Sequence, residues 1–126
     1  MSSTGLIRQK AKILVVDDDQ NVRFLTRQCL EAEGMVTIEA SNGFEAIDMF
    51  VRERPDLVFM DVEMPGMTGL EACRRIRELP QGESIPIMIV TGSDDRQSID
   101  QGFEAGATQY KTKPVNWSLL GRDVQY

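Results

Sequence analysis

Short runs of apolar residues alternate along this chain with longer segments in which apolar residues recur at helical spacing. The apolar runs predict strands at about residues 12–16, 35–40, 57–60, 85–90 and 108–112. The segments after them predict helices, the last of which begins near Val115. Strands that alternate with helices in this way are typical of βαβ units with right-handed crossovers. We therefore expect an α/β fold, a three-layer sandwich in which a five-stranded parallel sheet lies between helices.

Residues that favour helix ends support this division. Asp19 is placed to cap a helix over about residues 20–33, and Gly34 is placed to end it. Asn42 is placed to cap the second helix in the same way. The run Thr68-Gly69-Leu70-Glu71 is a capping box, which predicts the start of the third helix.

The apolar stripes of the helices predict which faces pack on the sheet. The first three helices each carry such a stripe: Val22, Leu25 and Cys29; then Ala46, Ile47, Phe50 and Val51; then Leu70, Cys73, Ile76 and Leu79. The fourth helix, about residues 95–104, has only Ile99 and Phe103. We expect it to be held loosely or to make contacts elsewhere, because so few apolar residues anchor it.

Two of the apolar runs lead directly into carboxylates. The run at 57–60 reads as a strand buried on both faces, and Asp61 follows it at its carboxyl end. The first strand ends in Asp17-Asp18-Asp19. The flavodoxin-like strand order 2-1-3-4-5 places the first and third strands side by side, so Asp17, Asp18 and Asp61 should converge at the crevice where ligands bind in such sheets.

Composition and charge narrow the class of protein. The chain has 126 residues, enough for one domain with a real core, and we expect a disordered lead-in over 1–10 and a single domain over 11–126. The net charge of −6 argues against direct binding to nucleic acid. No run has the length of a membrane span, and the start lacks the apolar stretch of a signal peptide. We interpret Cys29 and Cys73 as reduced thiols in the core, which favours a cytoplasmic protein.

The residue types available limit the possible chemistry. There is no histidine, which excludes Ser-His-Asp and Cys-His catalysis and histidine metal sites. Three converging carboxylates repel one another, and a bound divalent cation such as Mg²⁺ commonly offsets this repulsion. Thr91 ends the fourth strand and Lys113 ends the fifth, so a hydroxyl and a cation should reach the same edge. A metal, a hydroxyl and a cation around one carboxylate suit a phosphorylated carboxylate.

Each of these residues alone has a simpler interpretation. Thr91 alone would be a strand-end cap, Lys113 a solvated surface lysine, and the acidic triplet either a helix cap or a metal site. Their joint position, each at the end of its own strand, favours a functional site.

Four motifs in order carry a family resemblance over about residues 12–120. They are Ile13-Leu14-Val15-Val16-Asp17-Asp18-Asp19, Phe59-Met60-Asp61-Val62-Glu63-Met64-Pro65, Ile89-Val90-Thr91-Gly92 and Lys111-Thr112-Lys113-Pro114. At these separations the sequence resembles the receiver domain of two-component response regulators.

The resemblance implies a phosphorylation-controlled switch rather than an enzyme. Asp61 would take a phosphoryl group from a phosphohistidine on a sensor histidine kinase or a histidine phosphotransfer protein. Asp18 and Asp61 would bind Mg²⁺ directly, the backbone carbonyl of Glu63 would be a third ligand, and Asp17 would act through water.

The resemblance also implies how the signal leaves the site. Thr91 and Lys113 would contact the acyl phosphate, and the peptide between Lys113 and Pro114 would be cis. Tyr110 falls at the family's switch aromatic, whose rotamer follows Thr91. The face formed by the fourth helix, fifth strand and last helix would then bind an output domain or mediate self-association, with no membrane contact.

Two features differ from a generic receiver. Glu63 adds a carboxylate two residues after Asp61, where its side chain could reach the rim of the site. The tail at 114–121 resembles the corresponding segment of receivers that precede diguanylate cyclase or cyclic-dinucleotide phosphodiesterase domains. The helical pattern is still readable at Tyr126, as expected for a chain cut from a larger regulator.

Two other classes of protein remain open at this point. A haloacid-dehalogenase-like phosphatase also uses an Asp nucleophile with Mg²⁺, but it would want a second Asp where this chain has Glu63, and usually a cap domain. A pseudo-receiver would keep the fold as a binding module without phosphorylation, but it would normally lack part of the site.

Overall fold

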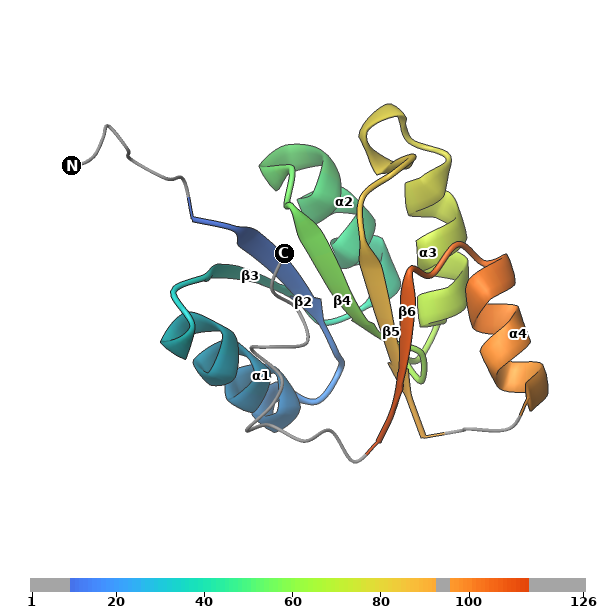
Figure 1. The fold of residues 1–126 in the computed structure, drawn as a ribbon, viewed down its shortest axis with the longest axis horizontal. Coiled ribbons are helices and arrows are strands. Elements are labelled where there is room, and N and C mark those ends of the chain that lie inside the picture. Colours follow the sequence, from blue (N-terminus) through green and yellow to red (C-terminus); the bar gives the residue numbers. More distant parts are fainter. Residues whose placement is uncertain (1–9, 93–95, 114–126) are drawn as a thin grey trace.

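The computed structural model describes residues 10–92 and 96–113. It has one sheet of five parallel strands, labelled as in Figure 1: β2 (Lys12–Val16), β3 (Val36–Ala40), β4 (Leu57–Asp61), β5 (Ile87–Thr91) and β6 (Gln109–Thr112). Their order across the sheet is β3-β2-β4-β5-β6. The predicted flavodoxin-like order 2-1-3-4-5 is therefore confirmed.

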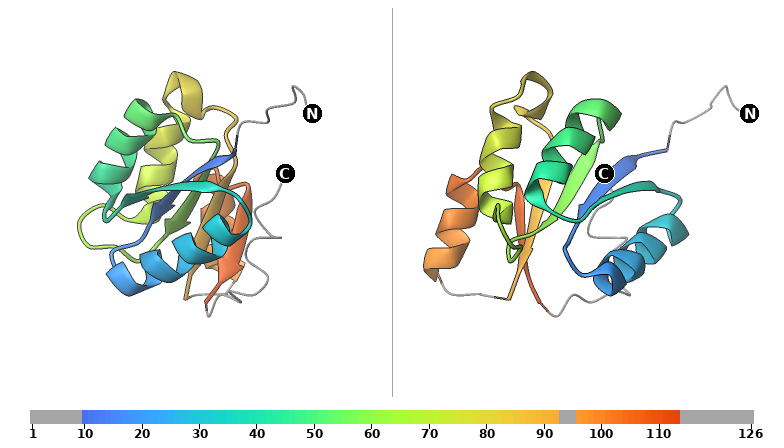
Figure 2. Two further views of the ribbon diagram at one scale, coloured as in Figure 1. Left: turned by 90° about the vertical axis from the view of Figure 1, so that its left-hand side faces the viewer. Right: turned by 180° about the vertical axis from the view of Figure 1, so that it is seen from behind.

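The helices lie on both faces of the sheet. They are α1 (Gln20–Ala32), α2 (Gly43–Glu53), α3 (Gly69–Arg77) and α4 (Arg96–Glu104), with a 3₁₀ turn, η1, at Pro80–Gly82. Helix α1 covers one face over β2 and β3, whereas α2 and α3 cover the other face (Figures 1 and 2). Helix α4 packs against the edge strand β6 on the α2 side. Among the described residues, no helix has the length and apolar character needed to cross a membrane.

The core has two parts, one on each side of the sheet. Alternate residues of β2 point to opposite faces, so Leu14 and Val16 pack with α2 and α3, whereas Ile13 and Val15 pack towards α1. Every residue of β4 and β5 is buried. This is the pattern expected for the middle strands of a parallel sheet covered on both faces.

The predicted helix caps are present. The side chain of Asp19 accepts a hydrogen bond from Asn21 N at 2.9 Å, and that of Asn42 accepts one from Glu45 N at 2.8 Å. Thr68 Oγ1 accepts from Glu71 N at 3.2 Å, but the Glu71 carboxylate pairs with Arg75 at 2.8 Å. These caps fix where each helix leaves the loop that follows its strand.

The predicted inward face of α1 is only partly confirmed, because Val22 and Cys29 are half-buried but Leu25 is not. Leu25 is 44% exposed, and the residues that α1 buries are Thr26 and Leu30. Burial of Thr26 is tolerated because its hydroxyl donates to the carbonyl of Val22 at 2.8 Å. Cys29, expected in the core, is only half-buried, and Val51 of α2 is 47% exposed.

Helix α4 is thinly anchored, as its sequence predicts. Ile99 is half-buried and Phe103 is 48% exposed. Its buried residue is Gly102, which faces the ring of Tyr110: a Cβ at Gly102 would lie 2.9 Å from Tyr110 Cδ2. Tyr110 therefore packs directly on the helix backbone.

Arg77 ties the end of α3 to the loops beside it. Its guanidinium donates to the carbonyl oxygens of Gly106, Gly82 and Ile85 and to Thr108 Oγ1, at distances between 2.6 and 3.2 Å. The planar, multiply donating guanidinium suits such a role. It holds the loop between α4 and β6 against α3.

Several predictions fall on residues outside the described ranges. They are the lead-in over residues 1–10 apart from Lys10, the last helix after Lys113, the tail at 114–121 and the peptide between Lys113 and Pro114.

Candidate functional site

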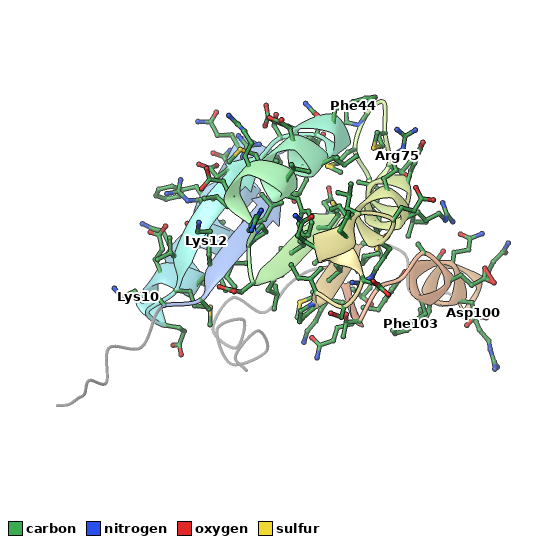
Figure 3. All side chains as sticks on the ribbon, turned by 90° about the horizontal axis from the view of Figure 1, so that it is seen from above. Lys10, Lys12, Phe44, Arg75, Asp100 and Phe103 are labelled. Atoms are coloured by element: carbon green, nitrogen blue, oxygen red, sulfur yellow. The ribbon has the colours of Figure 1, made fainter. Side chains whose placement is uncertain are left out.

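The candidate site lies at the carboxyl edge of the sheet, the lower edge in Figure 1. Asp61 is the last residue of β4 and Thr91 is the last residue of β5. Asp17 directly follows β2, and Lys113 directly follows β6. Because the strands are parallel, four different segments deliver these side chains to one edge. Figure 3 draws all side chains of the described residues from above, so the opposite, amino edge of the sheet faces the viewer.

Three carboxylates gather at this edge. Asp17, Asp18 and Asp61 each offer one oxygen, and these oxygens lie within 4.8 Å of one another. Asp17 and Asp61 are buried, with 5% and 2% of their surface exposed, whereas Asp18 is exposed. The backbone holds the cluster: Asp17 Oδ1 accepts a hydrogen bond from Asp19 N at 2.9 Å.

Crowding and burial raise the pKa values of the buried carboxyls. Burial raises the pKa of Asp17 from 3.8 to about 6, and the charge of Asp61 adds to the increase. Burial also raises the pKa of Asp61, against the lowering effect of Lys113. The folded protein therefore holds these negative charges at a cost in free energy, which a bound cation would offset.

The residues present fit a hard divalent cation such as Mg²⁺. Oδ1 of Asp61 is buried, and the ammonium of Lys113 at 3.0 Å is the cation that faces it among the described residues. A buried oxygen of this kind, beside two further carboxylates, has the donor chemistry that Mg²⁺ prefers. Asp17, Asp18 and Asp61 are thus the side chains that would hold the ion.

Lys113 approaches the cluster from the other side. Its Nζ lies 3.0 Å from Asp61 Oδ1, with the lysine side chain 36% exposed. Burial lowers the pKa of Lys113, but the carboxylates of Asp61, Asp17 and Glu63 outweigh burial, and the net shift is upward. The Lys113 amide donates to the Thr91 carbonyl at 2.8 Å, which extends the β5–β6 pairing to the site. Lys113 therefore stays charged and in place beside Asp61.

The carboxylate of Glu63 lies at the same edge. It accepts hydrogen bonds from the Thr91 hydroxyl and, at 3.1 Å, from Gly92 N. Its Oε1 lies 3.8 Å from Lys113 Nζ. Thr91, which is only 3% exposed, is thus engaged on the side that faces the site.

Tyr110 lies one strand away from Thr91, on β6. It pairs in register with Ile89 of β5, two residues before Thr91. Its ring is half-buried and stands 6.4 Å from the ring of Phe103, measured between centroids. The aromatic side chain is therefore adjacent to the strand that carries Thr91 but packed on α4.

Sequence reasoning missed two residues beside the site. Arg23 donates through Nη1 to the Asp17 carbonyl at 2.6 Å and pairs with Glu39 at 3.0 Å, which braces the acidic loop. No sequence signal marks Arg23, because the contact depends on how α1 is placed. Gly102 gives Tyr110 its place on α4, and a glycine inside a helical pattern was the available signal.

Comparison with known proteins decides the family. The chain matches the response regulator receiver domain over residues 13–125. It belongs to this family. The match includes all of the residues described above as parts of the site, from Asp17 to Lys113.

Relatives of different architecture share this domain. An uncharacterized 14.6 kDa protein of Leptolyngbya boryana is 42% identical over 113 residues, which are 90% of this chain and 86% of that protein. Sporulation initiation phosphotransferase F of Bacillus subtilis is 38% identical over 105 residues, 83% of each protein. The response regulator PleD of Caulobacter vibrioides is 41% identical over 111 residues, which are 87% of this chain but only 24% of PleD. The receiver domain thus spans most of some relatives and about a quarter of another.

Solved structures agree with this fold. The chemotaxis protein CheY4 of Vibrio cholerae superposes with a TM-score of 0.89 at 32% identity, over 93% of this chain and 98% of that one. The BeF₃-activated DrrB receiver domain gives a TM-score of 0.82 at 32% identity, over 92% and 95% of the two chains.

Proposed function

We propose that this receiver domain accepts a phosphoryl group on Asp61 from a phosphohistidine of a sensor histidine kinase or a histidine phosphotransfer protein. The observation that carries the proposal is the position of Asp61: buried at a strand end, with two carboxylates on one side and Lys113 at 3.0 Å on the other. The kinship with sporulation initiation phosphotransferase F supports a place in a phosphorelay. The domain acts as a signalling switch, not as an enzyme on a separate substrate.

The reaction assigns a role to each side chain. A carboxylate oxygen of Asp61 attacks phosphorus, the bond from phosphorus to the donor imidazole nitrogen breaks, and its electron pair stays on that nitrogen. Lys113 and the Thr91 hydroxyl donate to the phosphoryl oxygens. Asp18, Asp61 and the carbonyl of Glu63 would hold Mg²⁺ directly and Asp17 would do so through water; the ion would neutralise negative charge on the transferring group.

The change at Asp61 reaches the surface through Thr91 and Tyr110. The phosphoryl oxygens draw the Thr91 hydroxyl inward, and Tyr110 turns into the space behind it. Helix α4, anchored by half-buried Ile99 and half-exposed Phe103, has few contacts that resist repacking. The face of α4, β6 and the predicted last helix then binds an output domain or a second copy. By the likeness of the tail at 114–121, we propose an output domain that makes or degrades a cyclic dinucleotide.

One incubation tests the proposal. The protein is treated with acetyl phosphate and Mg²⁺, and its intact mass is measured. A receiver gains a single phosphoryl group, and Asp61→Asn abolishes the gain, whereas the exposed Asp48→Asn leaves it unchanged. Undiminished labelling of the Asp61→Asn variant would refute the assignment. A haloacid-dehalogenase-like phosphatase would instead hydrolyse many equivalents, and a pseudo-receiver would neither gain mass nor turn over.

The output step has its own measurement. Sedimentation velocity with and without beryllofluoride, together with amide exchange over residues 92–112, should show a change in mass or in protection. Thr91→Ala should still accept phosphate but transmit less of that change. If neither mass nor exchange responds, the route through Tyr110 is wrong.

A further inference from the structure

The Glu63 side chain is held by donors from two neighbouring strand ends. Its Oε2 accepts from the Thr91 hydroxyl. Its Oε1 accepts from Gly92 N at 3.1 Å and lies 3.8 Å from Lys113 Nζ. Both carboxylate oxygens are therefore engaged. Thr91 ends β5, Gly92 follows β5, and Lys113 follows β6.

This donor set is suited to an oxyanion. A hydroxyl, a backbone amide and an ammonium that converge on the oxygens of one anion are the groups that stabilise a phosphoryl group. Lys113 also lies 3.0 Å from Asp61 Oδ1, so a single ammonium serves both carboxylates. A phosphoryl group attached to Asp61 would be bound by the hydroxyl of Thr91 and the ammonium of Lys113. The Thr91 hydroxyl now donates to Glu63, and the ammonium lies between Asp61 and Glu63.

We propose that the Glu63 carboxylate is an internal competitor for the phosphoryl site. It binds the donors of Thr91 and Gly92 and lies 3.8 Å from the Lys113 ammonium while Asp61 is unmodified, and it must move away before those donors bind phosphoryl oxygens. The inference rests on the proposed function, because it assigns to Glu63 control over how readily Asp61 is phosphorylated. The Glu63 side chain is 53% exposed, so it can move into solvent without disturbing the core.

The competition predicts a direction of effect. Removing the carboxylate frees the Thr91 and Gly92 donors that bind it and leaves Lys113 paired with Asp61 alone. It also removes a like charge from the neighbourhood of the incoming anion, so phosphorylation should become faster. The backbone of Glu63 remains, so a side-chain substitution does not remove its carbonyl oxygen. A carboxylate that merely stabilised the loop would give no such gain.

The experiment compares Glu63→Ala and Glu63→Gln with Glu71→Gln as a matched control. Glu71 has similar side-chain exposure, 46% against 53%, but pairs with Arg75 on α3 away from the site. Binding of beryllofluoride in the presence of Mg²⁺ is measured by NMR titration. Phosphorylation by acetyl phosphate is measured from the intact mass. For Glu63→Ala we expect about tenfold tighter beryllofluoride binding and faster phosphorylation, equivalent to about 1.4 kcal/mol. Glu63→Gln should give an intermediate gain and Glu71→Gln a change below about twofold.

A second readout needs no bound anion. In protein without Mg²⁺ or beryllofluoride, the amide resonance of Gly92 should shift in both Glu63 variants and stay in place in Glu71→Gln. An unmoved Gly92 resonance, weaker beryllofluoride binding by Glu63→Ala, or equal gains from Glu63→Gln and Glu71→Gln would each overturn the inference. These results differ from failure of the proposed function, in which the wild-type protein takes up neither acetyl phosphate nor beryllofluoride.

Discussion

The ammonium of Lys113 lies 3.0 Å from Oδ1 of Asp61, across the end of strand β5, which separates their two strands in the sheet. Asp61 is 2% exposed and Lys113 is 36% exposed. The pair thus joins a buried carboxylate to a cation that still reaches water. Its main effect is to make the buried charge of Asp61 tolerable, because an unpaired buried carboxylate is costly.

Lys113→Ala should therefore destabilise the protein through Asp61. Without the ammonium, we expect the free energy of unfolding at pH 7 to fall by about 1–2 kcal/mol, reduced from the value for a fully buried pair because Lys113 is partly solvated. In an Asp61→Asn background the same substitution should cost less than about 0.5 kcal/mol. Urea unfolding of all four proteins in chelator measures the coupling. Equal losses in both backgrounds would contradict it.

Stability without metal should depend on pH through Asp17. Its pKa is raised from 3.8 to about 6 by burial, so the folded state binds the proton more tightly than the unfolded state. The stabilising contribution is fully present below about pH 4 and is lost as pH rises through about 6. Relative to wild type, Asp17→Asn should gain about 2.5 kcal/mol between pH 4 and 7. Urea unfolding across this range is the measurement, with exposed Asp48→Asn as the control; a constant difference between Asp17→Asn and wild type would show that Asp17 does not titrate in this way.

Magnesium should stabilise the folded chain if the three carboxylates hold it. At ten times the dissociation constant, linkage gives about 1.4 kcal/mol. For a domain of this size the melting temperature should rise by about 3–6 °C. Asp18→Asn should remove most of the rise, whereas Asp100→Asn on the exposed side of α4 should not. A melting temperature that does not respond to millimolar Mg²⁺ would count against the site.

Gly102→Ala should displace the ring of Tyr110. The added Cβ would lie 2.9 Å from Tyr110 Cδ2 and 3.0 Å from Cε2, closer than such atoms can approach. The side chain is easier to move than the helix, and alanine favours the helix by about 1 kcal/mol, so overall stability should change little. The NMR ring signals of Tyr110 and Phe103 should shift, as they should not in the control Gln97→Ala. Unchanged ring signals would show that α4 moves instead.

Local patterns in the sequence were enough for the architecture. Apolar runs, helix caps and the buried character of the 57–60 segment predict the strands and helices to within a few residues, because these features depend on neighbours in the chain. The motifs at Asp61, Thr91 and Lys113 also predict which strand ends carry polar groups. The parallel order then requires those ends to meet at one edge.

The rotation of a helix about its own axis, which decides the residues that face the sheet, was predicted less well. In α1, Leu25 was the more hydrophobic candidate, yet Thr26 is buried, which is tolerated because its hydroxyl donates to a carbonyl within the helix. Which residues of an amphipathic helix face inward is decided by the surface that the helix meets, and α1 meets one face of the sheet at β2 and β3.

The sequence by itself determined the fold class, the family and the set of polar residues delivered to one edge of the sheet. Only the tertiary structure decided how those residues contact one another: Glu63 against Thr91 and Gly92, Arg23 beneath the Asp17 carbonyl, and Tyr110 against Gly102. The reason is physical. Secondary structure and strand order follow from short-range preferences and burial, whereas these contacts join residues from separate elements and depend on side-chain rotamers and on helix placement to within about an ångström.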